Sequence, residues 1–165
     1  MDNGNILHAS HDNIHVLRFI GDIRYPLSPS LDRFLEKIFA SSRPAGFVIN
    51  LTETDSIDST NLGLLARLAK RMKTLDTRRI TIVSNRADIN SVLNSMALDE
   101  IFDIVEDASP EAAAAREVPL QDVDRETLTR TLIDAHRALM DLSEHNREIF
   151  QDVVTALEKN GATGG

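Results

Sequence analysis

The 165-residue chain has no cysteine, no tryptophan and few aromatic residues, six Phe and one Tyr. The absence of cysteine excludes disulfides, thiol nucleophiles and thiolate metal sites. Aliphatic side chains must therefore fill the core, for which a hydrophobic content of 42% is sufficient. No apolar run approaches the ~18 residues that span a membrane, and the N-terminus lacks the basic and apolar segments of a signal peptide. These absences predict a cytoplasmic protein that does not insert into membranes.

The chain also lacks an excess of positive charge, since its net charge is −8. This balance argues against general nucleic-acid binding, because displacing counterions from phosphates needs a basic surface. The charge is unevenly placed: 13 acidic and 12 basic groups in residues 1–105 give −1, and 13 acidic and 6 basic groups in residues 106–165 give −7. We therefore predict two modules, a domain at 1–105 and a helical extension at 125–160, joined by a connector at 106–124.

Residues 1–105 alternate between strand and helix patterns. Strand patterns lie at 6–10, 14–20, 47–51, 79–84 and 101–105. Helix patterns lie at 31–39, with Ser28 or Ser30 as a cap, at 60–75 and at 87–96. The unbroken apolar run at 47–51 is typical of a strand that is buried on both faces. The order of elements predicts an α/β fold with a mixed, largely parallel sheet and helices packed on it.

The connector carries the helix-start signal Ser109-Pro110-Glu111 and ends near Pro119, which predicts one or two helical turns. The extension that follows has a heptad seam. Its members are Leu128, Leu132, Ala135, Leu139, Leu142, Asn146, Ile149, Val153 and Ala156. An unbroken helix of ~36 residues would be ~54 Å long, longer than a domain of this size is wide. Either the helix projects and pairs with a second chain, with Asn146 setting the register, or it bends near 143–146 into a hairpin on its own domain.

The most informative segment is the acidic loop between the strand at 47–51 and the helix at 60–75. Its carboxylates are those of Glu53, Asp55 and Asp58, and no basic residue occurs at 44–66. The first turn of a helix favours negative charge, because its backbone N–H groups lack intrahelical partners. Ser59 lies at this turn. It is either an ordinary helix cap or a residue that accepts a phosphate.

These residues resemble a known family. The stretch Val48-Ile49-Asn50-Leu51, followed by Ile57-Asp58-Ser59-Thr60-Asn61-Leu62-Gly63-Leu64-Leu65, resembles the signature of STAS domains, above all the bacterial anti-sigma factor antagonists. Upstream, the segment 17–23 is similar to the family's hydrophobic strand followed by Gly-Glu-Leu/Ile. The resemblance covers residues 6–105. The family usually has glycine where this chain has Asn61, and we expect asparagine to tolerate the unusual backbone angles of such a turn.

The resemblance implies a partner switch without catalysis or cofactor. The unmodified protein would bind an anti-sigma factor or an anti-sigma-like serine kinase. The kinase would phosphorylate Ser59, with Thr60 as a secondary candidate, and a PP2C-type phosphatase would reverse the reaction. The partner-binding residues would be Asp22, Asp55, Asp58, Ser59, Thr60 and Asn61.

Three other functions stay open. A receiver domain would be phosphorylated on aspartate with Mg²⁺, but the strand pattern at 101–105 lacks the expected lysine. A scaffold module would form homodimers through the C-terminal helix and use Ser59 only as a cap. A sensor of a nucleotide or another small ligand is also compatible with a STAS-like fold.

The histidines and the serine suggest no further chemistry. Metal sites need three or four converging ligands, and His8, His11 and His15 are better explained as surface residues of the first hairpin. His136 and His145 lie nine residues apart and indicate no site. Ser59 lacks a Gly-x-Ser-x-Gly context and an identifiable base, which argues against a hydrolase nucleophile.

Overall fold

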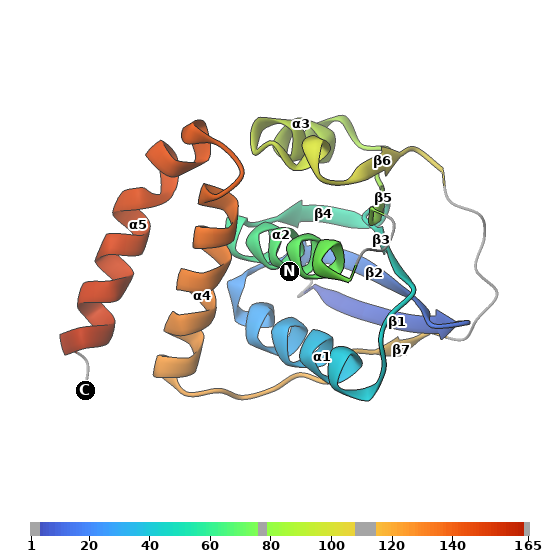
Figure 1. Cartoon of the computed structure of the whole chain (residues 1–165), viewed down its shortest axis with the longest axis horizontal. Helices are drawn as coiled ribbons and strands as arrows, with labels where there is room; N and C mark the ends of the chain where they lie inside the picture. The colour runs from blue at the N-terminus through green and yellow to red at the C-terminus, as the bar shows by residue number, and fades with distance from the viewer. Residues whose placement is uncertain (1–3, 76–78, 108–114, 164–165) are drawn as a thin grey trace.

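A seven-stranded mixed sheet and five α-helices make up the computed structural model, which describes residues 4–75, 79–107 and 115–163 (Figure 1). The strands are β1 Asn5–His11, β2 Ile14–Ile23, β3 Gly46–Asn50, β4 Thr54–Ile57, β5 Thr81–Val83, β6 Asp103–Val105 and β7 Arg116–Glu117. The helices are α1 Ser28–Ser41, α2 Ser59–Thr74, α3 Ala87–Ser95, α4 Arg125–Met140 and α5 Glu144–Thr163, with 3-10 turns η1 Tyr25–Leu27 and η2 Leu98–Glu100. The predicted α/β class is confirmed. Within the described ranges, no helix combines the length and apolar character needed to cross a membrane.

The sheet has the order β6-β5-β3-β2-β1-β7, and β4 pairs with the far end of β2. The pairs β2–β3, β3–β5 and β5–β6 are parallel, and β1 is antiparallel to both β2 and β7. The ten-residue β2 lies first along β3 and then, from Gly21 to Ile23, along β4. The Asp58 N–H then donates to the Ile23 carbonyl oxygen at 3.0 Å. This pairing places the start of α2 at the end of β2.

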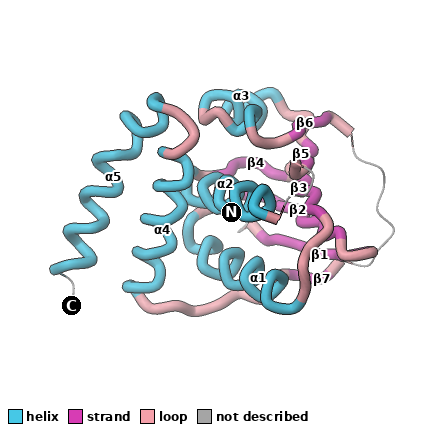
Figure 2. Tube along the Cα trace, in the orientation of Figure 1, coloured by secondary structure: helices cyan, strands magenta, loops and turns pink. Residues whose placement is uncertain are grey.

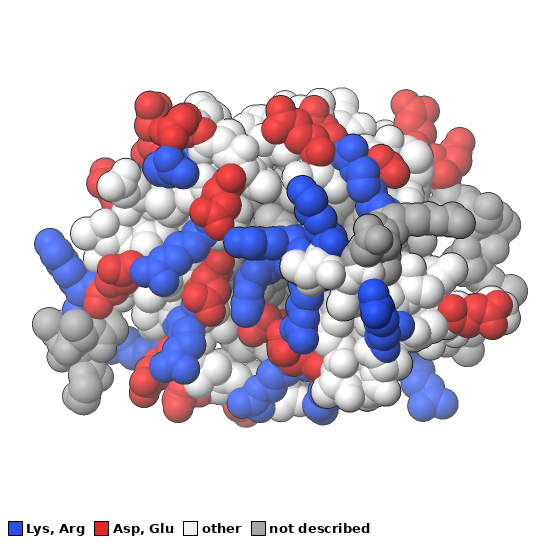
Figure 3. Space-filling model, in the orientation of Figure 1, with Lys and Arg blue, Asp and Glu red and all other residues white. Residues whose placement is uncertain are grey.

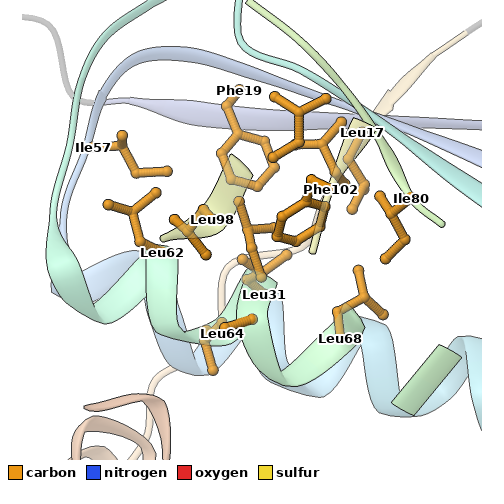
Figure 4. Close-up of a cluster of buried hydrophobic side chains, with 14 of the residues drawn as sticks. Leu17, Phe19, Leu31, Ile57, Leu62, Leu64, Leu68, Ile80, Leu98 and Phe102 are labelled. Atoms are coloured by element: carbon orange, nitrogen blue, oxygen red, sulfur yellow. The ribbon is translucent and has the colours of Figure 1, made fainter. Parts of the chain in front are cut away.

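One face of the sheet carries the core. Side chains of β2 alternate between buried and half-buried, and Figure 2 shows α1 and α2 in front of the strands. The buried face is aliphatic apart from a few phenylalanines (Figure 4). The fully buried side chains between this face and the helices include Leu17, Phe19, Leu31, Leu62, Leu64, Ile80, Leu98 and Phe102. In β3, Phe47 and Ile49 are buried while Val48 is only half-buried. The prediction that this strand is buried on both faces is therefore wrong, since the helices cover only one.

Helix α1 begins without the predicted serine cap. Its N-cap residue is Leu27, which makes no side-chain capping bond. The Ser28 hydroxyl donates to the Tyr25 carbonyl oxygen at 2.6 Å, and Ser30 Oγ accepts the Gln121 N–H at 2.8 Å. Both serines are thus used, but one closes the preceding turn and the other holds the distant connector.

Two short strands were not predicted. Strand β4 has the mostly polar sequence TDSI, and β7 is the dipeptide Arg116–Glu117, which pairs with β1. The predicted helix start at 109–111 lies outside the described residues. Part of the connector is therefore a strand, because the exposed edge of β1 offers it a partner.

The C-terminal extension is a helical hairpin that packs on its own domain. Helix α4 lies against α2, and α5 lies on the outer side of α4 (Figure 1). Asn146 is fully buried where α5 begins, and its Nδ2 donates to the carbonyl oxygens of Leu139 at 2.8 Å and Met96 at 2.9 Å. The polar member of the seam thus ties the bend to both α4 and α3.

Candidate functional site

Asp58, not Ser59, caps helix α2. Asp58 is the N-cap residue in extended conformation, and its Oδ1 accepts the backbone N–H of Asn61 at 3.0 Å and the Asn61 side-chain amide at 2.9 Å. Ser59 is the first residue of the helix. The hydroxyl of Ser59 is therefore not needed to start α2, which argues against the interpretation as an ordinary cap.

The Ser59 hydroxyl instead contacts the C-terminal hairpin. Its Oγ lies 2.8 Å from Nε2 of His136 on α4, and the other ring nitrogen, Nδ1, lies 2.7 Å from the Leu132 carbonyl oxygen. A carbonyl oxygen only accepts, so Nδ1 carries a hydrogen, and Nε2, when it carries none, accepts a hydrogen bond from the Ser59 hydroxyl. The His136 side chain is only 4% exposed and its ring centroid is 5.2 Å from that of Phe150 on α5. Helix α4 thus holds the hydroxyl that the sequence marks for modification.

The sequence analysis missed His136. The prediction that Ser59 has no identifiable base nearby is wrong, since the Ser59 and His136 side chains are hydrogen-bonded across 77 positions of the chain. No local spacing connects them. The one available signal is that His136 follows Ala135 of the heptad seam, and this signal becomes useful only if the seam is known to pack on α2.

Three of the predicted carboxylates gather where β2 and β4 end. Asp22 on β2 accepts the Ser56 hydroxyl of β4 at 2.8 Å. Asp55 is exposed on the same strand, and Asp58 follows directly after it. The parallel pairing of β2 with β4 therefore brings residues from two distant segments to the start of α2.

Two carboxylates of the acidic loop are paired with arginines, although the loop sequence itself contains no basic residue. Glu53 forms an ion pair with Arg18, and Asp55 lies 3.0 Å from Arg86, whose guanidinium also donates to the Thr54 carbonyl oxygen. The bases come from β2 and from the residue before α3, so a search within 44–66 does not find them. Asp22 and Asp58 instead accept hydrogen bonds from neutral groups. Of the two, Asp58 directly precedes Ser59 in the chain.

The other two predicted site residues are buried. Thr60 is 3% exposed and Asn61 is 0% exposed, whereas Ser59 is half-buried. Exposure therefore favours Ser59 over Thr60 as the modified residue. Asn61 lies in the first turn of α2, and positive φ angles of the described residues occur elsewhere, so the expected unusual backbone at this position is not found. Its side-chain amide donates to Asp58.

The histidines of the first hairpin form a packed pair. His8 Nε2 lies 2.9 Å from His15 Nδ1, and the His8 ring also packs edge-on against Phe34. Burial, and secondly the nearby His15, lower the pKa of His8 to about 4. In the part of the chain that the structure describes, no group of three His, Asp or Glu side chains could hold a metal ion. The pair therefore belongs to the packing of the hairpin.

Comparison with known proteins agrees with this geometry. The structure is similar to the crystal structure of an anti-sigma factor antagonist from Mycobacterium paratuberculosis, with a TM-score of 0.54 and 20% identity over 64% of this chain and 87% of that chain. No curated protein matches the sequence. The family model of the STAS domain matches residues 5–112, so helices α4 and α5 lie beyond the matched region. With 108 of its 165 residues in that match, the chain belongs to the STAS domain family.

Proposed function

We propose that the protein is an anti-sigma factor antagonist that works as a phosphorylation-gated partner switch. The observation that carries the proposal is the position of Ser59, whose hydroxyl stands at the first turn of α2 while Asp58 caps the helix. In the unmodified state the surface around Ser59 binds an anti-sigma factor or an anti-sigma-like serine kinase. The chain itself needs neither catalysis nor a cofactor for this role.

The modification is a phosphoryl transfer from ATP. The kinase joins the γ-phosphorus to Ser59 Oγ, the bond from that phosphorus to ADP breaks, and the hydroxyl proton leaves. A PP2C-type phosphatase reverses the change by hydrolysis, which returns the hydroxyl and releases inorganic phosphate. Both enzymes are separate proteins.

The energetics place the effect of the phosphate at an interface. It adds roughly −1.5 to −2 charge, and the helix start stabilises that charge by only ~0.3–1 kcal/mol. This is small beside a typical unfolding free energy of ~5–15 kcal/mol. Repulsion from one carboxylate is ~1 kcal/mol in water and ~4 kcal/mol at a partly desolvated surface. Carboxylates of the bound partner, or those of Asp55 and Asp58 where the partner desolvates them, can therefore supply the ~2.7 kcal/mol that a hundredfold loss of affinity requires.

A scaffold role is the second candidate, and exposed apolar residues of α5 favour it. Ile149 is 47% exposed and Val153 is 41% exposed, although both belong to the heptad seam. A second copy of the chain could cover them and form a homodimer through the C-terminal helix. In that case Ser59 would have no regulatory task.

Capture from a cell lysate separates these functions. Immobilised wild type and the Ser59→Ala variant should retain a kinase-like or anti-sigma partner in mass spectrometry, and Ser59→Asp should lose it about a hundredfold, which corresponds to ~2.7 kcal/mol. Ser41→Asp is the matched control, because it adds the same charge at an exposed serine, the last residue of α1. Equal recovery by all four proteins would contradict the proposal. Acid-stable phosphate on Ser59 would exclude the acyl phosphate of a receiver.

A further inference from the structure

The C-terminal hairpin, α4 with α5, occupies the face of α2 that begins at Ser59. From this arrangement we infer that the hairpin is a displaceable cover, and that α4 must leave α2 before Ser59 is phosphorylated or a partner docks there. The inference rests on the proposed function, since that function names what uses the face. It adds the regulation of this site and the kind of partner that fits it.

Helices α2 and α4 approach each other closely at Gly63. A Cβ atom on Gly63 would lie 2.8 Å from the Cβ of Ala135 and would also collide with the Ala135 backbone carbonyl. Ala135 is fully buried in this contact. Only a helix with a small residue can approach α2 so closely. The surface therefore fits a partner helix that presents alanine or glycine opposite Gly63, as α4 does.

A phosphate on Ser59 cannot coexist with the docked hairpin. The 2.8 Å between Ser59 Oγ and His136 Nε2 is a hydrogen-bond distance, and a phosphoryl group would have to enter that space. His136 cannot simply swing away, because Leu132 holds its Nδ1 and Phe150 lies beside its ring. Phosphorylation is thus compatible only with the state in which α4 has left.

The other half of the contact is incompletely filled. Between the end of α4 and the C-terminal half of α2 lies an open pocket of about 440 Å³. Its apolar lining consists of Ala66, Ala69, Met72, Ile80, Ile101, Ala138 and Leu142, and its rim carries Lys70, Lys73, Arg79, Glu100 and Asp141. The two helices are therefore not packed against each other along the whole length of α2.

Charged residues of α2 add little to the docking of the hairpin. Figure 3 shows Lys and Arg side chains across the middle of the molecule in this view, and helix α2 carries Arg67, Lys70 and Arg71. Arg67 pairs with Asp32 and Arg71 with Glu36, both on α1. Lys70 reaches Asp141 after α4 at 3.5 Å, but both side chains are mostly exposed, and such pairs are typically worth ~0–1 kcal/mol. The hairpin is held by the contacts around Gly63 and Ser59, by Leu139 and Phe150, which belong to the buried core, and by the hydrogen bond of Asn146 to Met96.

The absence of cysteine makes the exposure of position 59 directly measurable. A Ser59→Cys variant carries one thiol, and its alkylation by iodoacetamide is followed by intact mass. A second substitution, Ala135→Arg, keeps α4 helical but removes the space beside Gly63. We expect Cys alkylation at least tenfold faster in Ser59→Cys/Ala135→Arg than in Ser59→Cys alone. Loss of the neighbouring imidazole would lower the reactivity of the thiol, so a faster reaction reports access.

Two controls define the scale of this measurement. Thr155→Arg introduces the same side chain at an exposed position of α5 and should leave the rate at position 59 unchanged. Ser41→Cys, on the exposed end of α1, gives the rate of a fully accessible thiol. Amide exchange of β3, recorded on each variant, shows that the sheet is intact. If Ala135→Arg unfolds the sheet, Phe150→Ala takes its place, because Phe150 supports His136 from outside the sheet.

The outcomes separate the inference from the proposed function. Equal alkylation rates with and without Ala135→Arg would overturn the inference. Alkylation of Ser59→Cys as fast as that of Ser41→Cys would also overturn it, because the hairpin would then not cover position 59. So would alkylation of Ser59→Cys no faster than the β3 amides exchange, because the hairpin would then leave only when the whole fold opens. None of these measurements uses a partner. Equal capture of the partner by the Ser59→Ala and Ser59→Asp variants would contradict the proposed partner switch, but it would not contradict the inference that the hairpin covers Ser59.

Discussion

At the scale of single residues, Asp58 and Ser59 divide two tasks that either side chain could perform. The carboxylate of Asp58 accepts the Asn61 N–H, and the hydroxyl of Ser59 reaches His136 on another helix. Both residue types are good helix caps, so composition alone does not decide between them. Because Asp58 caps the helix, a phosphate on Ser59 would not remove a hydrogen bond that α2 needs.

This division predicts different effects on stability. Replacing the capping side chain in Asp58→Ala should lower the unfolding free energy by about 1 kcal/mol, within the ~0.5–2 kcal/mol range of lost N-caps. Urea unfolding followed by circular dichroism measures the change. Asp58→Asn keeps an acceptor oxygen and should stay close to wild type. An Asp58→Ala variant as stable as Asp58→Asn would mean that the cap contributes nothing.

The sequence indicates the carboxylates of the site but not their partners. Asp22 and Asp58 lie in the segments that resemble the family signature, and Asp55 lies in the acidic loop; the structure places all three on β2, on β4 or directly after β4. Arg86 and His136 do not follow from it, because they approach from other elements. A motif encodes the residues of one segment, whereas ion pairs and hydrogen bonds between segments depend on the packing.

At the scale of elements, periodicity predicts those that bury a continuous apolar face. Helix α2 was predicted at 60–75 and found at Ser59–Thr74, with Leu64, Leu65, Leu68 and Met72 inward. Strands β4 and β7 were not predicted, because β4 has four residues of which three are polar and β7 has only two, so neither shows a periodic apolar pattern. Such strands depend on a neighbour with unpaired backbone groups, which one segment of sequence does not reveal.

The heptad seam fits a long helix and a hairpin equally well, and the bend at Asn146 decides between them. Asn146→Ala removes both amide hydrogen bonds and leaves the carbonyl oxygens of Met96 and Leu139 without these donors. We expect a loss of about 1–3 kcal/mol in unfolding free energy, the cost of unsatisfied buried polar groups. Urea unfolding measures this loss. Asn94→Ala, at an exposed position on α3, is the control and should change stability little; equal effects of the two would contradict the role of the bend.

At the scale of the whole molecule, the His8–His15 pair makes stability depend on pH. In the fold the pKa of His8 is lowered to about 4, and burial lowers that of His15 as well. The unfolded chain, with a histidine pKa of ~6.5, therefore binds more protons than the fold between these values. Linkage then requires that stability is full above pH ~6.5 and falls as the pH drops towards 4.

Replacing His8 tests this dependence. In His8→Asn, the midpoint of urea unfolding should fall less between pH 7 and pH 4.5 than in wild type. His11→Asn is the matched control, because the His11 side chain is mostly exposed and should keep the wild-type slope. If the His8–His15 pair did not titrate between pH 7 and pH 4.5, the unfolding midpoints of wild type and His8→Asn would change equally with pH.

Helix α2 precedes α4 in the chain, and translation gives this order a consequence in time. Residues 59–74, the whole of α2, are synthesised before residues 125–140 of α4. At about 5–20 residues per second, the 66 residues from 75 to 140 take roughly 3–13 s to synthesise. Every newborn molecule therefore presents Ser59 to the cell uncovered for some seconds. A kinase or partner that meets nascent chains could act in that interval without waiting for α4 to detach.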